Sequence, residues 1–321
     1  RSISARNSGC SVAPMEPANP KDAATASPLE FTGERFTPEC VREIYYEHWH
    51  RYAWARQLVT GLDVLDCACG EGYGSRLLAD SAHSVAGVDL DPASIAHARQ
   101  RYAAETLSFH QANALELPFD DQRFDCVVSF ETLEHLAAHD ALLTEFRRVL
   151  KPGGFLLLSS PDRKTYSDET GYNNEFHVRE LYRDEFEALL NRHFPNYAIF
   201  GQKLMFESVL WSLDRAGRGP LGDAEHLTAE ADGRVSKAAR PATAPLYFIA
   251  VAAAAGVERP PIATLSLFTD RAESVYQHYN DEVRKHIRAG HLLAEREREI
   301  ERLRQLKTPL WKRLRQLLGH Q

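Results

Sequence analysis

The residues with the clearest chemical potential form one short run, Asp66-Cys67-Ala68-Cys69-Gly70-Glu71-Gly72-Tyr73-Gly74. The run follows the apolar pair Val64-Leu65, where a buried strand would end and a helix would begin. Glycines at such a junction let the main chain turn tightly and approach a ligand closely. The run therefore predicts a ligand-binding loop at the carboxyl edge of a parallel sheet. A tight turn without a ligand is the alternative explanation for the glycines alone.

Two features of this loop narrow the class of ligand. Its glycine spacing is G-x-G-x-G, and Ser75 stands where a dinucleotide fingerprint requires glycine. Asp66 would repel a bound pyrophosphate, whereas a ligand ammonium or sulfonium would tolerate its negative charge. The pattern favours a positively charged nucleoside without phosphates over a nicotinamide dinucleotide.

A second carboxylate, Asp89, lies 17 residues beyond Gly72, at the end of the predicted strand 84–89. A carboxylate at this sheet edge can accept hydrogen bonds from both hydroxyls of a ribose. Capping of the following helix is the alternative role, but Asp91, followed by Pro92, already supplies a cap. We therefore expect Asp89 to bind a ribose.

Alternating strands and helices must position these residues. Strand-like apolar segments cover 64–68, 84–89, 107–110, 124–130 and 155–159. Helical patterns cover 39–60, 75–79, 91–102, 141–150 and 180–191. This alternation predicts a parallel sheet with helices on both faces. Segments 197–206 and 245–253 are expected to pair as a terminal antiparallel hairpin, and the aromatic residues of 39–60 to pack on the domain or cover its ligand.

The predicted organisation has four parts. They are a disordered tail at 1–30, a cap helix region at 31–60, the main α/β domain at 61–256 with a polar insertion at 211–244, and a helical extension at 270–321. We expect Met15 to be the natural start. The extension contains a coiled-coil-like stretch at 270–306 and a short basic amphipathic helix at 310–318.

Composition excludes several classes of partner. The net charge of −7 argues against nucleic-acid binding through bulk electrostatics. Cys67-x-Cys69 lacks the second ligand pair that a zinc site needs, so no metal is expected, and the buried-looking cysteines fit a reducing cytoplasm. The sequence shows no signal peptide, and its longest apolar run, Leu246–Val257, is too short to span a bilayer.

Several further motifs occur in a fixed order along the chain. They are Asp66…Gly70-Glu71-Gly72, Asp89, Asn113–Phe119, Phe124–Ser129, Leu133–Leu136 and Leu150–Gly154. Over about residues 60–205 this order resembles class I S-adenosylmethionine (SAM)-dependent methyltransferases of the type 11 group. The flanking segments Thr32–Phe36 and Asn174–His177 also resemble bacterial methyltransferases encoded with O-antigen and other surface-glycan genes.

The resemblance implies a Rossmann-like class I methyltransferase fold in the α/β class, with SAM as cofactor. The sheet would be mostly parallel with an antiparallel terminal hairpin, followed by a C-terminal helical extension. Asp66 would lie near the methionine end of SAM, and the carbonyl of Asn113 would accept a hydrogen bond from adenine. The full set of implied cofactor-binding residues is Asp66, Cys69, Gly70, Gly72, Asp89, Leu90, Asn113, Ala114 and Ser129.

Methyl transfer from a sulfonium is an SN2 displacement with a good leaving group, so the enzyme mainly aligns the reactants. A hydroxyl acceptor also needs a base. The candidate bases are His135, His177 and Glu131, with Glu134 beside them. A structural or cofactor-proximal role for His135 stays equally open.

We expect O-methylation of a small-molecule or glycan acceptor, foremost a bacterial surface-glycan (O-antigen-like) precursor. A quinone, lipid or secondary metabolite is the alternative acceptor, and a non-catalytic SAM-binding interaction module is the alternative function. A nicotinamide oxidoreductase is disfavoured by Ser75 and Asp66. The C-terminal helix is expected to form a homodimer or a peripheral contact with the inner face of the membrane, or to remain a solvated helix.

Overall fold

The computed structural model describes residues 43–209, 226–229, 234–238, 243–307, 314–315 and 317–319. These residues fall into two compact units. One spans Glu47–Ser266, and the other combines the first turn of the first helix with the chain from Leu267 onward. The predicted tail at 1–30 and most of the predicted helix at 310–318 lie outside the described residues.

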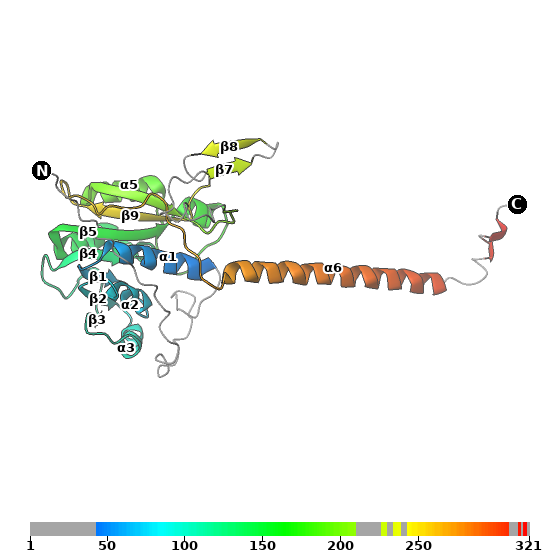
Figure 1. Cartoon of the computed structure of the whole chain (residues 1–321), viewed down its shortest axis with the longest axis horizontal. Coiled ribbons are helices and arrows are strands. Elements are labelled where there is room, and N and C mark those ends of the chain that lie inside the picture. Colours follow the sequence, from blue (N-terminus) through cyan, green and yellow to red (C-terminus); the bar gives the residue numbers. More distant parts are fainter. Residues whose placement is uncertain are drawn as a thin grey trace, which may run out of the picture. The chain divides into compact units, whose positions relative to one another are not determined.

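The first unit is built on a seven-stranded sheet with the order β3-β2-β1-β4-β5-β9-β6 (Figure 1). Its strands are β1 (Asp63–Cys67), β2 (Ser84–Asp89), β3 (Leu107–Gln111), β4 (Phe124–Ser129), β5 (Leu150–Pro161), β6 (Asn196–Gln202) and β9 (Tyr247–Ala253). The first five strands run parallel, and β9 runs antiparallel to both β5 and β6. The predicted parallel sheet with an antiparallel terminal hairpin is confirmed.

Helices cover both faces of this sheet. They are α1 (Glu43–Leu58), α2 (Tyr73–Ala79), α3 (Pro92–Arg101), α4 (His139–Val149) and α5 (Arg183–His193). Successive side chains of a strand point to opposite faces. Leu65 of β1 therefore joins the core that contains Phe146 of α4 and Phe186 of α5. Its neighbour Asp66 faces the other way and contacts Tyr52 of α1. This alternation places the loop-forming strand between two helical layers.

The helix predicted at 141–150 ends where expected, but β5 begins five residues before the strand predicted at 155–159. The helix ends at Val149, and β5 begins at Leu150, which pairs with Phe124 across a register shift. A Cβ on Gly154 would lie 2.8 Å from the main-chain oxygen of Asp125. Glycine therefore allows the two strands to approach closely, and the segment forms the irregular first part of a strand.

Two short helices follow the carboxyl ends of β4 and β5. They are η1 (Leu133–His135) and η2 (Lys164–Asp168). The predicted insertion at 211–244 contains a separate two-stranded sheet made of β7 (His226–Ala229) and β8 (Val235–Ala238). Most of the remaining insertion lies outside the described residues.

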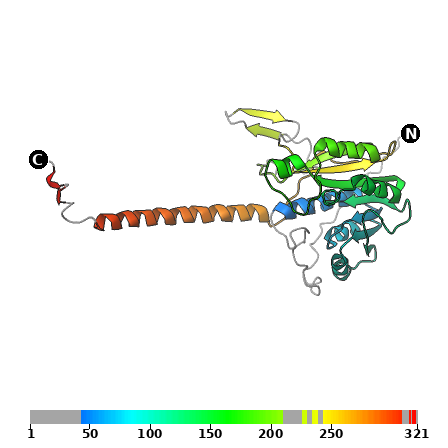
Figure 2. The same cartoon turned by 180° about the vertical axis from the view of Figure 1, so that it is seen from behind.

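The second unit contains the long helix α6 (Ser274–Lys307), which is continuous over its length (Figure 2). Asp270 lies just before this helix. Its carboxylate accepts hydrogen bonds from the main-chain nitrogen of Ser274 and from the hydroxyl of Tyr46, both at 2.9 Å. The Tyr46 ring meets Phe268 edge-on, with centroids 5.5 Å apart. Among the described residues, no helix combines the length and apolar character that crossing a bilayer requires.

Candidate functional site

The glycine-rich loop joins β1 to α2 at the carboxyl edge of the sheet, where the strand order reverses between β1 and β4. Ala68, Gly70 and Gly72 have φ angles of 61°, 56° and 97°. A Cβ on Gly72 would lie 2.8 Å from Cβ of Ala98 and 2.9 Å from the ring of Phe109. Gly72 is therefore needed for the loop to pack on α3 and β3. Ala68 holds a strained backbone conformation of the kind that gathers at functional sites.

Asp89 ends β2 beside this loop. One carboxylate oxygen accepts from the main-chain nitrogen of Gly70 at 2.8 Å, and the other accepts from that of Asp91 at 2.9 Å. Because an ionised carboxylate has about four acceptor positions, lone pairs remain for a ligand. Asp91 caps α3 as predicted, by accepting from two amides of its first turn. The adjacent Leu90 side chain is 67% exposed. These contacts leave Asp89 and Leu90 available to a ligand.

Asp66 lies beneath the loop and is fully buried. Its carboxyl group accepts hydrogen bonds from the Tyr52 hydroxyl at 3.1 Å and the Ser75 hydroxyl at 2.6 Å. Burial raises the pKa of Asp66 to about 7, although both hydrogen bonds favour the charged form, and the charge of Asp89 raises it further. A cationic group bound nearby would favour the carboxylate again.

The segment after β3 forms a tight turn. The side-chain oxygen of Asn113 accepts from the main-chain nitrogen of Leu115 at 3.0 Å. The main-chain nitrogen of Ala112 donates to the main-chain oxygen of Asp89 at 3.0 Å. Ala114 and Leu115 are partly buried against the core. The side-chain oxygen of Asn113 would therefore accept from both Leu115 and the adenine. Its second lone pair permits this.

The end of β4 contributes a buried hydroxyl. Ser129 is fully buried, and within the described part of the chain its Oγ has no hydrogen-bond partner. A buried hydroxyl of this kind usually meets a ligand or a water. Cys69 is also buried, and burial raises the pKa of its thiol well above the usual value, so it stays neutral.

Glu131 follows β4 with a φ of 51° and belongs to a buried ion pair. Its Oε1 lies 2.5 Å from Nη1 of Arg51, whose side chain is 1% exposed. The Ser159 hydroxyl donates to the same oxygen at 2.6 Å, and the guanidinium of Arg51 lies 4.6 Å from the ring centroid of Tyr247. These contacts hold the carboxylate of Glu131 in one position. The arrangement favours a positioning role for Glu131 over its predicted role as a base.

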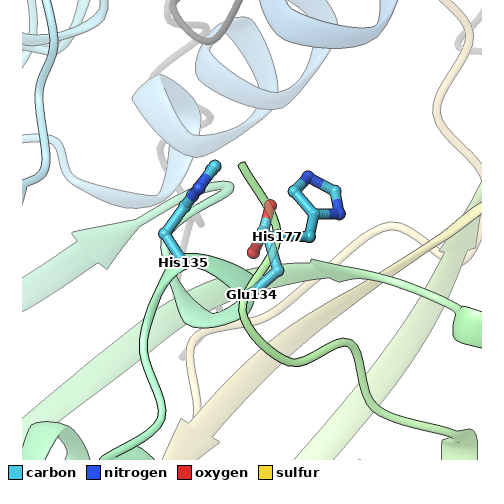
Figure 3. A group of neighbouring side chains, drawn as sticks. All are labelled: Glu134, His135 and His177. Atoms are coloured by element: carbon cyan, nitrogen blue, oxygen red, sulfur yellow. The ribbon is translucent and has the colours of Figure 1, made fainter. Parts of the chain in front are cut away.

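Two other predicted candidates, His135 and His177, come together beside the carboxyl group of Glu134. Figure 3 shows that the carboxyl group lies between the two imidazole rings. The ring centroids are 5.2 Å apart and the rings are nearly perpendicular, at 88°. Glu134 is 1% exposed, and burial, helped by the charge of Glu131, raises its pKa well above the usual value.

Hydrogen bonds orient both rings. Nδ1 of His135 lies 3.0 Å from the main-chain oxygen of Phe176. Nδ1 of His177 lies 2.6 Å from a carboxylate oxygen of Glu180, and its Nε2 lies 3.0 Å from the amide nitrogen of Asn174. These acceptors assign the hydrogen of each ring to Nδ1. Nε2 of each ring therefore carries the lone pair.

Main-chain contacts fix the distance between the two segments. The nitrogens of Val178 and Arg179 donate to the main-chain oxygen of Glu134 at 2.8 and 3.0 Å. The ring of Tyr166 stacks on His177, with centroids 5.3 Å apart and an interplanar angle of 26°. The histidine pair is thus held at the carboxyl edge of the sheet by hydrogen bonds and by an aromatic neighbour.

Comparison with known proteins decides the family. Residues 65–158 match the model of a methyltransferase domain. A probable S-adenosylmethionine-dependent methyltransferase of Mycobacterium tuberculosis is 39% identical over 219 residues, which cover 66% of this chain and 78% of that relative. The chain belongs to the SAM-dependent methyltransferases. Its Rossmann-like sheet is the fold that the sequence resemblance implied.

Other relatives of the methyltransferase carry more specific names. A phthiotriol/phenolphthiotriol dimycocerosates methyltransferase of Mycobacterium leprae is 29% identical over 199 residues, 56% of this chain and 71% of the relative. A fatty-acid O-methyltransferase of Mycolicibacterium smegmatis is 39% identical over 101 residues, 31% of this chain and 37% of the relative. The crystal structure of the Bacillus YcgJ protein aligns with a TM-score of 0.46 and 18% identity, covering 65% of this chain and all of that one.

The residues at the loop fit SAM, which supplies a methyl group on a positively charged sulfur. Asp89 keeps free lone pairs beside the exposed Leu90, and Ser129 presents a buried hydroxyl without a partner among the described residues. We propose that Asp89 holds the ribose, that Leu90 and Asn113 contact the adenine, and that Asp66 favours the cationic methionine end. Gly70 and Gly72 shape the loop main chain, and Cys69 and Ala114 contribute packing.

Several residues of the site were not singled out from the sequence. Glu180 orients His177 from three positions further along the chain, so their spacing was a usable signal. Asn174 was noted only as part of a flanking motif. Arg51 lies 80 positions before its partner Glu131, and no local pattern connects them. Ion pairs between distant segments need the fold before they are visible.

The raised pKa of Asp66 predicts a pH-dependent stability. The folded value is about 7 and the ordinary value is 3.8, so the folded protein binds more protons than the unfolded chain between these pH values. Stability should therefore fall as the pH rises from about 4 to about 7. Between about pH 5 and pH 8 the loss attributable to Asp66 is at most ~3 kcal/mol. Denaturant unfolding of the ligand-free protein and of Asp66→Asn at both pH values measures it, and parallel pH profiles would refute the assignment.

Proposed function

We propose that this methyltransferase transfers the methyl group of SAM to an acceptor hydroxyl, foremost that of a bacterial surface-glycan precursor. The observation that carries the proposal is the oriented pair of His135 and His177 at the carboxyl edge of the sheet. A hydroxyl has to lose its proton when its oxygen attacks, and imidazole suits this work near neutral pH. An acceptor with a thiol in place of the hydroxyl would ionise without this pair of histidines.

In the proposed reaction the acceptor oxygen forms a bond to the methyl carbon while the carbon–sulfur bond breaks. The electron pair of that bond stays on sulfur, and the hydroxyl proton leaves to the site and then to solvent. The residues of this chain align the two reactants, which accounts for much of the rate enhancement in such displacements. Glu131 and Arg51 support this alignment by fixing the segment after β4.

Aromatic residues near His177 support a glycan acceptor. Tyr166 stacks on the histidine, and Tyr172, whose side chain is 55% exposed, lies 5.9 Å from Tyr166 between ring centroids. Tyrosine rings offer an apolar face and a polar tip, which match the two kinds of surface on a sugar. The segment Asn174–His177 also carries the sequence resemblance to glycan-cluster enzymes.

A lipid is the second candidate acceptor. The relatives named for phthiotriol/phenolphthiotriol dimycocerosates and for fatty acids favour it, although the second of them matches only 31% of this chain. Incubation of the full chain with labelled SAM and matched panels of glycan precursors, fatty acids and long-chain alcohols separates the two. We expect label on a glycan hydroxyl. Label confined to the lipid panel would replace the glycan with a lipid, and label on nitrogen alone would refute O-methylation.

We also propose that α6 is an association surface, either for a second copy of the chain or for a membrane surface. Its apolar side chains at Leu293, Ile300 and Leu303 are between 49% and 65% exposed. Such residues on a single helix favour contact with another apolar surface. Light scattering and liposome sedimentation of the full chain and of a chain ending at residue 273, which lacks α6, test the proposal. The proposal would be refuted if both forms are monomers that stay in the supernatant when the liposomes sediment.

A further inference from the structure

Glu134, His135 and His177 offer one ligand atom each, and these atoms lie within 4.8 Å of one another. Two imidazoles and one carboxylate on neighbouring segments form a set that binds divalent transition metals while leaving coordination positions open. No local sequence pattern indicates such a site, because His177 lies 42 positions from His135.

The hydrogen bonds around the histidines match those of metal ligands. A metal-binding histidine commonly donates the N–H of its other ring nitrogen to a carboxylate or to a main-chain oxygen. His135 donates from Nδ1 to the main-chain oxygen of Phe176, and His177 donates from Nδ1 to Glu180. The Nε2 atoms remain as the ligating atoms. At His177 a cation would take the place of the Asn174 amide, which now lies 3.0 Å from Nε2.

Glu134 supplies an independent observation. Its side chain is 1% exposed, and its Oε2 has no hydrogen-bond partner within the described part of the chain. A buried carboxylate without partners is costly unless a positive charge compensates it. Figure 3 shows this carboxyl group directed between the two imidazole rings, where a cation bound to all three residues would lie.

We propose that Glu134, His135 and His177 bind one divalent transition-metal cation, with open positions for an oxygen ligand. The binding itself does not depend on the acceptor. A further step, which rests on the proposed O-methylation, is that the acceptor hydroxyl coordinates this cation. Coordination makes a hydroxyl more acidic, so its proton leaves to solvent as the oxygen attacks the methyl carbon. In the metal-bound protein the two histidines are ligands, and this role replaces the proton-accepting role that the proposed function gives them without a metal.

Mn²⁺ is a suitable probe because it prefers nitrogen and oxygen ligands over the thiols of the chain. The full chain is stripped with a chelator, dialysed and titrated with Mn²⁺ while free Mn²⁺ is followed by electron paramagnetic resonance. We expect about one bound equivalent per chain and a rise in melting temperature. Glu134→Gln and His177→Gln should lose the bound equivalent. The control His193→Gln should keep the bound equivalent. His193 lies at the end of α5 and pairs with Asp140 of α4.

Binding of S-adenosylhomocysteine by each variant reports that the protein remains folded. Absence of Mn²⁺ binding by the wild type, or equal binding by folded Glu134→Gln and His177→Gln, would overturn the metal site. Full transfer activity of the stripped protein in the presence of a chelator would overturn the activating role. Both results are distinguishable from failure of the proposed function, because metal binding is measured without any acceptor and full transfer activity itself shows that the proposed function holds.

Discussion

Replacement of Asp89 by alanine is expected to lower the affinity for SAM about 1,000-fold. The reason is that hydrogen bonds to a charged group are each worth about 1.5–3 kcal/mol, and the two ribose hydroxyls would lose both of theirs. The carboxylate also accepts from the main chain of Gly70, so its loss loosens the loop as well. Equilibrium dialysis with labelled SAM measures the change.

Asp91 provides the matched control for this experiment. It lies two residues further along, and its side chain caps α3. Asp91→Ala should cost about 1 kcal/mol of stability through loss of the cap while leaving the affinity for SAM nearly unchanged. If both variants lose affinity equally, or if folded Asp89→Ala binds SAM normally, the ribose assignment is wrong.

The second large effect concerns the ion pair between Arg51 and Glu131. Glu131→Gln would leave the guanidinium of Arg51, 1% exposed, without its charged partner. Breaking a buried pair from one side costs about 3–5 kcal/mol. Denaturant unfolding should therefore show a loss of this size. The double variant Arg51→Met with Glu131→Gln should recover much of it, because the guanidinium that lost its partner is then absent.

An exposed pair on the same unit gives the reference for this loss. Arg76 and Asp80 form an ion pair on α2, with side chains 41% and 31% exposed. Asp80→Asn is expected to cost less than about 1 kcal/mol. Similar losses for Glu131→Gln and Asp80→Asn would show that the Arg51 pair is not a buried network. Additive losses in the double variant would give the same conclusion.

Local patterns made much of the fold predictable. The strand at 84–89 and the cap at Asp91 follow from short-range signals, a buried apolar run and a cap residue followed by proline. Residues 150–154 were not predicted as part of a strand, because Pro-Gly-Gly usually ends an element. The neighbouring strand β4 pairs with this segment, and that contact is invisible from local sequence.

The chemical centre was only partly predictable, for the same reason. His135 and His177 were candidates from their residue type, but their contact with Glu134 depends on main-chain bonds between η1 and the segment that follows His177. Glu131 has a suitable residue type for a base, but its carboxylate forms an ion pair with Arg51. The chemistry of a side chain follows from its neighbours, and here those neighbours come from distant parts of the chain.

We expect the loop after β1 and the carboxylate after β2 to hold a phosphate-free nucleoside. Calorimetric titration of the purified full chain with S-adenosylhomocysteine, and separately with NAD, tests it most directly. We expect saturable binding of S-adenosylhomocysteine and no binding of NAD. Binding of NAD without any binding of S-adenosylhomocysteine would contradict it.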